Sequence, residues 1–297
     1  MKNKPLALLA AFTATLIYGI NHTVAKEVMP HYVGGFGFIF LRIAGATLLF
    51  WIVSLFISAP KIEKKDFPIL LIGSVFGMGV NMLSFFKGLE FSTPINSGII
   101  VTTTPIIVVL LSTLYLKEQL KAFKLIGLSL GLLGAILLLV TTEEASLIYN
   151  APNIPLGNLL LIGNALTFGI YLVIITPLTR KYHTITLMKW MFLFGFFLTL
   201  PFTYGEFSEI QWIGIPFDAY WRIGFVVLGT TFLVYLLNVY ALKILSPTVV
   251  SSLVYVQPVI AISFALLTGN DHLNLTKVVS FLLVIVGVYL VSKTRTA

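Results

Sequence analysis

One stretch of the sequence occurs twice, and this repeat constrains the fold more than any other feature. Residues 89–138 lie over residues 242–291 at a constant offset of 153 residues, without a gap. Matches between leucines mean little in an apolar chain, so five other matches carry the argument: Pro94 with Pro247, Pro105 with Pro258, Glu118 with Asp271, Lys124 with Lys277 and Gly134 with Gly287. An ungapped match of this kind indicates an internal duplication.

The composition indicates a membrane protein. Of the 297 residues 58% are hydrophobic and 10% are charged, and the mean hydropathy is +1.00. Soluble domains are about 25% charged, and a core of this size could not hide so much apolar surface. The net charge of +8 could point to nucleic acid, but the basic residues stand between apolar runs. We therefore expect a lipid bilayer as the partner, and no nucleic acid.

Ten segments approach the length of about 20 apolar residues that a membrane-spanning helix needs. We expect these helices at residues 5–25, 34–58, 67–88, 94–116, 122–141, 156–178, 185–204, 219–242, 247–268 and 274–292. Each should be helical because lipid offers no hydrogen-bond partner to an open backbone group. The first apolar run continues to Val24 without a cleavage site, so we interpret it as a helix and not as a secretory signal. The expected fold class is an all-α polytopic membrane protein with ten transmembrane helices.

The basic residues predict the orientation in the membrane. With the N-terminus inside, 14 of the 19 Lys and Arg residues lie in inner segments, four lie in outer segments, and Arg42 lies within a helix. Inner loops of membrane proteins carry an excess of Lys and Arg. We therefore expect an integral protein of the bacterial cytoplasmic (inner) membrane, with both termini in the cytoplasm.

A second match extends the repeat to the whole chain. Residues 15–32 lie over residues 165–182 at an offset of 150, which places five helices in each half. Because five is an odd number, the second half must be inverted relative to the first. We expect repeats at residues 1–142 and 156–297, joined by an outer loop at residues 143–155. Inverted repeats are typical of transporters, whose substrate site lies near the midplane where the halves meet.

Several motifs resemble those of one family. They are YGINHTVAK at residues 18–26, Leu41–Arg42, the prolines at 94 and 105, and LKEQL at residues 116–120. With them the chain resembles the EamA-type branch of the drug/metabolite transporter superfamily. The resemblance implies a ten-helix transporter, usually an exporter of small metabolites. It also implies a cavity lined by the helices at 5–25, 67–88, 94–116, 156–178, 219–242 and 247–268. The chain departs from the family at Tyr18, where Trp is frequent, and at Lys117, where a small residue is usual.

The repeated prolines predict where the cavity lies. Pro105 and Pro258 fall in the middle of apolar segments, and each removes a backbone hydrogen bond of its helix. The resulting kink could act as a gating hinge, or it could be a tolerated bend in which threonine hydroxyls satisfy the freed carbonyls. If the kinks meet at the same depth, the residues just before them face one central cavity. These residues are Thr103, Thr104, Tyr255 and Gln257.

Amide and aromatic side chains extend this candidate site. The amides recur on the helices that the resemblance assigns to the cavity: Asn21, Asn81, Asn96, Asn164 and Asn238. The accompanying aromatic residues are Tyr18, Phe85, Tyr171, Tyr235 and Tyr255. Aromatic faces with a few amides suit a small amphipathic ligand. Each amide could instead serve only as a hydrogen-bond link between helices.

The charged and titratable residues of the apolar segments have alternative interpretations. Glu118 and Asp271 precede the last helix of each half, and we interpret them as helix caps rather than as substrate contacts, so that Glu118→Gln costs about 1 kcal/mol or less. Arg42 could bind a carboxylate, reach outward to the interface, or pair with a backbone carbonyl. His22 could carry a proton or could be buried and hydrogen-bonded.

These features together predict a transporter, in the direction of export, of small neutral or zwitterionic metabolites such as amino acids, by alternating access. One alternative is a transporter of nucleotide sugars or sugar phosphates, which needs fixed cations, and only Arg42 and Lys87 are available. Another is an interaction subunit that transports nothing. A membrane-embedded enzyme needs a paired Asp, a Ser/His arrangement or His-x-x-x-His spacing, and the four histidines show none of these. We therefore expect no catalytic residue, no metal and no cofactor.

Overall fold

The computed structural model describes residues 3–29, 31–92, 94–140, 152–267 and 274–293, and every regular element among them is helical. The first half contains α1 (Lys4–Val28), α2 (Gly35–Leu55), η1 (Lys64–Asp66), α3 (Phe67–Ser74), η2 (Val75–Gly79), α4 (Val80–Phe91), α5 (Pro94–Val101), α6 (Thr104–Tyr115) and α7 (Ala122–Val140). The second half contains α8 (Ile154–Lys181), α9 (Thr184–Ser208), η4 (Trp212–Gly214), α10 (Phe217–Phe225), η5 (Val226–Leu233), α11 (Val234–Leu242), α12 (Pro247–Ser252), η6 (Leu253–Tyr255), α13 (Val256–Leu267) and α14 (Leu275–Lys293).

Eight helical runs of the described chain are long and apolar enough to cross a membrane. They are Lys4–Asn21, Gly35–Leu55, Lys64–Phe91, Asn96–Tyr115, Ile154–Lys181, Thr184–Ser208, Phe217–Leu242 and Leu275–Ser292. Two further apolar helices, Ala122–Leu137 and Pro247–Ile260, are shorter. These runs and helices fall on the apolar segments of the sequence, so the predicted helical membrane protein is confirmed. Asp271 and most of the outer loop expected at 143–155 lie outside the described residues.

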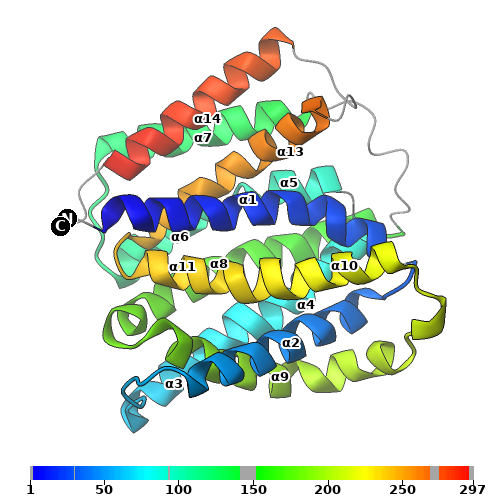
Figure 1. Cartoon of the computed structure of the whole chain (residues 1–297). Coiled ribbons are helices and arrows are strands. Elements are labelled where there is room, and N and C mark those ends of the chain that lie inside the picture. The colour runs from blue at the N-terminus through cyan, green and yellow to red at the C-terminus, as the bar shows by residue number, and fades with distance from the viewer. Residues whose placement is uncertain (1–2, 30, 93, 141–151, 268–273, 294–297) are drawn as a thin grey trace.

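The two halves of the chain pack with matching contacts. Helix α2 packs against its counterpart α9, and α7 packs against its counterpart α14. Helix α4 of the first half packs against α8 of the second half, and correspondingly α11 of the second half packs against α1 of the first. Figure 1 shows the α7–α14 pair at one edge of the bundle and the α2–α9 pair at the opposite edge, with α1, α11, α8 and α4 between them. This arrangement agrees with a fold built from two repeats.

Two of the spans contain a π-helical segment, η2 between α3 and α4 and η5 between α10 and α11. At the offset of 153 residues Gly77 of η2 corresponds to Thr230 of η5, so the segments are equivalent. A π-turn disturbs the regular α-helical hydrogen bonds, and such turns are frequent at functional sites. The hydroxyl of Tyr235 donates to the carbonyl oxygen of Gly77 at 3.0 Å, and Nη2 of Arg42 donates to that of Thr230 at 3.4 Å. No pattern in the sequence predicted these segments.

The repeated prolines coincide with breaks in the helices. In the first repeat, α5 ends at Val101 and α6 begins at Thr104. In the second repeat, the 3-10 helix η6 separates α12 from α13. The hydroxyls of Thr102 and Thr103 donate to the carbonyl oxygens of Ile99 and Ile100 at 2.5 and 2.7 Å. Both carbonyls also accept the backbone N–H groups of Thr102 and Thr103, and neither is the carbonyl of Val101, four residues before Pro105. The gating hinge and the tolerated bend therefore both stay predictions.

Glycines allow the backbones of α7 and α14 to approach closely. A Cβ atom at Gly287 would lie 2.5 Å from the backbone nitrogen of Gly131 and 2.6 Å from the backbone oxygen of Gly127. Because these atoms belong to the backbone, neither helix can make room without moving as a whole. We expect Gly287→Ala to lower the free energy of unfolding by about 1–3 kcal/mol, the usual cost of overpacking. Thermal unfolding in detergent would measure the loss.

Gly224→Ala in α10 is the matched control because no atom lies within 4 Å of the position of its new Cβ. In a helix the added methyl group should leave stability unchanged or raise it slightly. Equal melting temperatures of the two variants would contradict the close packing of α7 on α14.

Candidate functional site

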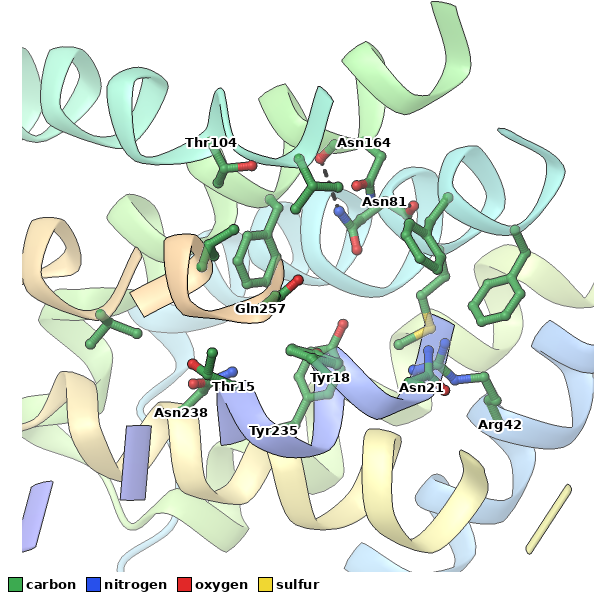
Figure 2. A pocket seen from close by; sticks show the side chains of 17 residues that line it. Thr15, Tyr18, Asn21, Arg42, Asn81, Thr104, Asn164, Tyr235, Asn238 and Gln257 are labelled. Carbon is green, nitrogen blue, oxygen red and sulfur yellow. Dashed lines mark hydrogen bonds between the residues drawn. The ribbon is translucent and has the colours of Figure 1, made fainter. Parts of the chain in front are cut away.

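A central cavity lies among helices from both halves, and nine of the predicted site residues line it (Figure 2). Its amide side chains come from α1, α4, α8, α11 and α13, and they are Asn21, Asn81, Asn164, Asn238 and Gln257. Its aromatic and hydroxyl side chains from the predicted set are Tyr18, Phe85, Thr104 and Tyr235. Amide groups of five different helices thus meet in one place, although no two of these helices are adjacent in the sequence.

The volume of the cavity limits the size of a ligand. It measures about 90 Å³. Ligand pockets of proteins typically measure about 300–1,000 Å³, so this cavity suits a small ligand better than a nucleotide sugar.

Four predicted site residues lie elsewhere. Tyr171 and Tyr255 are fully buried, and their rings pack where Gly77 and Gly131 have no side chain, 2.5 Å from the position of a Cβ atom. Thr103 is exposed on the outside of the helix break, and Asn96 is half-buried but does not line the cavity. Their role as substrate contacts stays a prediction. The structure places them away from this cavity because spacing along a helix does not tell which neighbour offers room.

The cavity also has walls that the sequence did not predict. Thr15 contributes a hydroxyl one helical turn before Tyr18, a spacing that could have revealed it. The other unpredicted residues are apolar: Met82, Phe86, Val101, Phe168, Val250 and Val254. Nothing distinguishes these residues from the many apolar side chains that pack between helices or face lipid.

Two of the cavity amides also connect helices. Nδ2 of Asn81 donates to the backbone oxygen of Asn164 at 3.1 Å, and Nδ2 of Asn164 donates to the backbone oxygen of Asn81, also at 3.1 Å. Figure 2 shows this reciprocal pair at one wall of the cavity. Their NH2 groups therefore hold α4 against α8, as the alternative interpretation of these amides required. No hydrogen bond joins the amide of Gln257 or Asn238 to a described residue, so these two groups remain available to a ligand.

Arg42 is the charged residue of the cavity wall. It is 4% exposed, its Nε donates to Oγ1 of Thr231 at 2.7 Å, and its guanidinium carbon lies 4.7 Å from the centre of the Phe86 ring. A second, longer hydrogen bond runs from its Nη2 to the backbone oxygen of Thr230. Two of the five N–H donors of Arg42 therefore have acceptors in the described part of the chain. None of the ion pairs among the described residues includes Arg42. A buried cation without a counter-ion is costly, so an anionic group belongs beside it.

Asn21 lies next to Arg42 in the cavity (Figure 2). It is 3% exposed, and its Oδ1 has no hydrogen-bond partner among the described residues. Leaving a buried acceptor unpaired costs about 1–3 kcal/mol, so a donor is expected at this position. Arg42 and Asn21 together suit a ligand that carries an anionic group beside an N–H or O–H donor.

The other charged residues singled out by the sequence lie outside the cavity wall. Lys87 pairs with Glu90 at 2.9 Å and with Glu206 at 2.7 Å. Glu118 forms an ion pair with Lys124, and Oγ1 of Thr248 in the second half donates to it at 2.9 Å. Its interpretation as a helix cap is wrong, because none of its hydrogen bonds among the described residues goes to a backbone N–H.

The side chain of His22, the candidate proton carrier, lies outside what the structure describes. Among the residues that are described, no group of three or more His, Asp or Glu side chains could hold a metal ion.

A bundle of apolar helices of membrane length around a small polar cavity defines the chain as an integral membrane transporter. The chain belongs to the EamA-like transporter family, whose model matches residues 5–140 and 155–293. The family that the sequence motifs resemble is thereby confirmed.

Individual proteins support this assignment. The uncharacterized transporter YetK of Bacillus subtilis is 26% identical over 71% of this chain, and the match covers 64% of YetK, slightly less than two thirds. An uncharacterized transporter of Archaeoglobus fulgidus is 26% identical over 86% of this chain and 87% of its own length. YoaV of Bacillus subtilis, also named an uncharacterized transporter, is 25% identical over 95% of both chains. One crystal structure has a TM-score of 0.76 over 96% of both chains at 17% identity, which shows a shared fold.

Proposed function

We propose that this protein exports small zwitterionic metabolites, amino acids or related compounds, across the bacterial inner membrane by alternating access. The observation that carries the proposal is the unpaired Arg42 in the wall of the central cavity, beside the unpartnered oxygen of Asn21. A ligand carboxylate bound to Arg42, with an adjacent ligand ammonium or hydroxyl group bound to Asn21, would give both side chains the partners that they lack. Metabolites without an anionic group would leave the buried cation unpaired, which narrows the expected class from neutral or zwitterionic compounds to those with a carboxylate.

The proposed topology has ten membrane-spanning helices in two inverted repeats of five. Nζ of Lys4 at the start of α1 donates to the backbone oxygen of Ser292 at the end of α14, at 2.9 Å. The first and last helices therefore meet at one end of the bundle (Figure 1), which requires an even number of crossings. The excess of basic residues supports the cytoplasm as the location of this end. We keep the repeat boundaries at residues 1–142 and 156–297 as part of the proposal.

The alternative of a nucleotide sugar or sugar phosphate has less support. Such ligands need several fixed cations for their phosphates. Arg42 lines the cavity, whereas Lys87, the other cation available by sequence, is paired with Glu90 and Glu206. A volume of about 90 Å³ is also small for a ligand of this kind.

A counterflow experiment tests the proposal. The full chain is purified, reconstituted in liposomes loaded with one unlabelled compound, and assayed for uptake of the same compound carrying a label. We expect accumulation of some small amino acids, and none of the corresponding amines and amides, which lack the carboxylate. Accumulation only of sugars or nucleosides would contradict the proposed substrate class, and no accumulation of any compound by folded protein would contradict transport of small metabolites.

A further inference from the structure

A second cavity lies at the end of the bundle where α1 begins and α14 ends (Figure 1), and it shares no residue with the central cavity. Its volume is about 350 Å³, against about 90 Å³ for the central cavity. The end of α2, the linker that follows it, the start of α3 and the start of α9 form its walls. Because α9 belongs to the second half, an occupant would contact both halves of the protein.

The second cavity carries two lysines without a counter-ion. Lys61 and Lys189 both line it, no carboxylate lines it, and no ion pair among the described residues includes either lysine. The nearest acid in the sequence, Glu63, pairs with Lys65 and Lys181, both at 2.8 Å. Hydrogen bonds from Lys181 and Lys65 hold the pKa of Glu63 below its usual range, so this acid stays ionised and engaged with those partners. The cavity therefore presents two positive charges to a ligand.

Trp51 adds a hydrogen-bond donor that lacks an acceptor. Its Nε1 is buried and has no partner among the described residues, and the ammonium of Lys189 lies 4.9 Å from the centre of its ring. Burying an N–H group without an acceptor costs about 1–3 kcal/mol. Trp51 and Lys189 line the same cavity, so an anionic group bound there could accept from both of them. Two cations and one N–H donor form a binding site for phosphate oxygens, which only accept hydrogen bonds.

The apolar residues around the second cavity favour the phosphate group of a lipid over inorganic phosphate. Ile57, Phe67 and Trp190 form apolar walls of the cavity. Between the lining residues Ser54 and Ile57, the chain at the end of α2 carries Leu55 and Phe56, which are 79% and 82% exposed and in a membrane protein face acyl chains. Tryptophan and lysine side chains are typical of the headgroup level of a bilayer. A ligand that carries hydrocarbon next to a phosphate uses both kinds of wall, whereas inorganic phosphate uses one.

We propose that this second cavity binds the phosphate group of an anionic phospholipid, such as phosphatidylglycerol, from the leaflet at this end of the bundle. Basic pockets between helices on the cytoplasmic side of membrane proteins are suited to such headgroups. The proposal does not depend on which metabolite the central cavity accepts.

Tryptophan fluorescence tests this proposal directly. The full chain carries Trp212→Phe and Trp221→Phe, so that Trp51 and Trp190 are the two that remain of the four tryptophans. The protein in detergent is titrated with phosphatidylglycerol or phosphatidylcholine that carries brominated acyl chains, which quench nearby indoles. We expect phosphatidylglycerol to quench at concentrations at least about tenfold lower than phosphatidylcholine, since each lysine near a membrane surface strengthens anionic-lipid binding about fivefold.

Two pairs of substitutions provide the specificity test. The double variant Lys61→Gln and Lys189→Gln should lose the preference for phosphatidylglycerol. The control double variant, Lys64→Gln and Lys121→Gln, should keep this preference, although it changes the net charge of the protein by the same amount. Neither Lys61 nor Lys189 forms an ion pair with a described residue, so the fold should persist, and the melting temperature of each variant checks this. Equal quenching by both lipids, or equal loss in both pairs of variants, would overturn the site. Displacement of phosphatidylglycerol by an equal concentration of inorganic phosphate would overturn the lipid as the ligand.

Discussion

Replacing Arg42 with glutamine is expected to weaken the binding of a small carboxylate-bearing substrate by about 30-fold or more. Removing one member of a buried, hydrogen-bonded charge pair costs about 2–5 kcal/mol of binding free energy, and each 1.4 kcal/mol is a factor of ten. Glutamine can still donate to Oγ1 of Thr231, the acceptor that Nε of Arg42 uses at 2.7 Å. The fold should therefore be retained. Equilibrium binding of an amino acid selected by counterflow measures the loss.

The amide of the same amino acid is the control ligand. The wild-type protein should bind this amide weakly, and Arg42→Gln should change its affinity little, because the group that Arg42 recognises is already missing. Arg42→Lys should show an intermediate loss, because an ammonium keeps the charge but not the planar pair of donors. An equal loss for acid and amide, or unchanged affinity with a lowered melting temperature, would mean that Arg42 only holds the π-helical segment η5.

Replacing Glu118 with glutamine is expected to lower the free energy of unfolding by about 3–5 kcal/mol. The side chain of Glu118 is 13% exposed and that of its partner Lys124 is 3% exposed. Removing one partner of such a pair leaves a buried charge without compensation, which is far more costly than losing a helix cap. Thermal or denaturant unfolding of the purified protein measures the change, and affinity for the substrate should stay the same.

Two further variants separate the buried ion pair from a general effect of charge. Adding Lys124→Met to Glu118→Gln removes the uncompensated ammonium and should restore part of the lost stability. Glu63→Gln breaks a pair in which the glutamate is 50% exposed, and exposed pairs contribute at most about 1 kcal/mol. If Glu118→Gln costs no more than Glu63→Gln, the buried pair does not stabilise the fold as described.

Most of the fold class was predictable from local sequence. Apolar runs of membrane length predicted helices, and the described residues form helices over those runs. The resemblance also implied a small residue where this chain has Lys117. The structure supplies the reason, since Lys117 has a φ of 53°, in the left-handed region that favours glycine. Helices also cover the fifth and ninth expected segments, as α7 over Ala122–Val140 and as α12, η6 and α13 over residues 247–267.

The site was less predictable than the fold. Helical spacing identified polar residues that are costly in lipid, and most of these line the central cavity. Tyr171 and Tyr255 were equally plausible by sequence, but glycines on neighbouring helices leave room for their rings away from the cavity. Arg42 allowed several interpretations. The structure shows one of them, the bond to the backbone oxygen of Thr230, and it places Arg42 in the cavity wall, where the binding of a carboxylate stays a prediction.

A duplicated, helical membrane protein can be deduced from this chain without coordinates, because length, polarity and repetition are properties of contiguous residues. Which polar groups meet is a matter of packing. Arg42 bonds Thr231 across 189 residues of sequence, and Thr248 bonds Glu118 across 130. The partner of each buried charge determines whether that charge stabilises the fold or remains available to a ligand. That partner depends on how helices far apart in the chain pack against one another, and no local pattern contains this information.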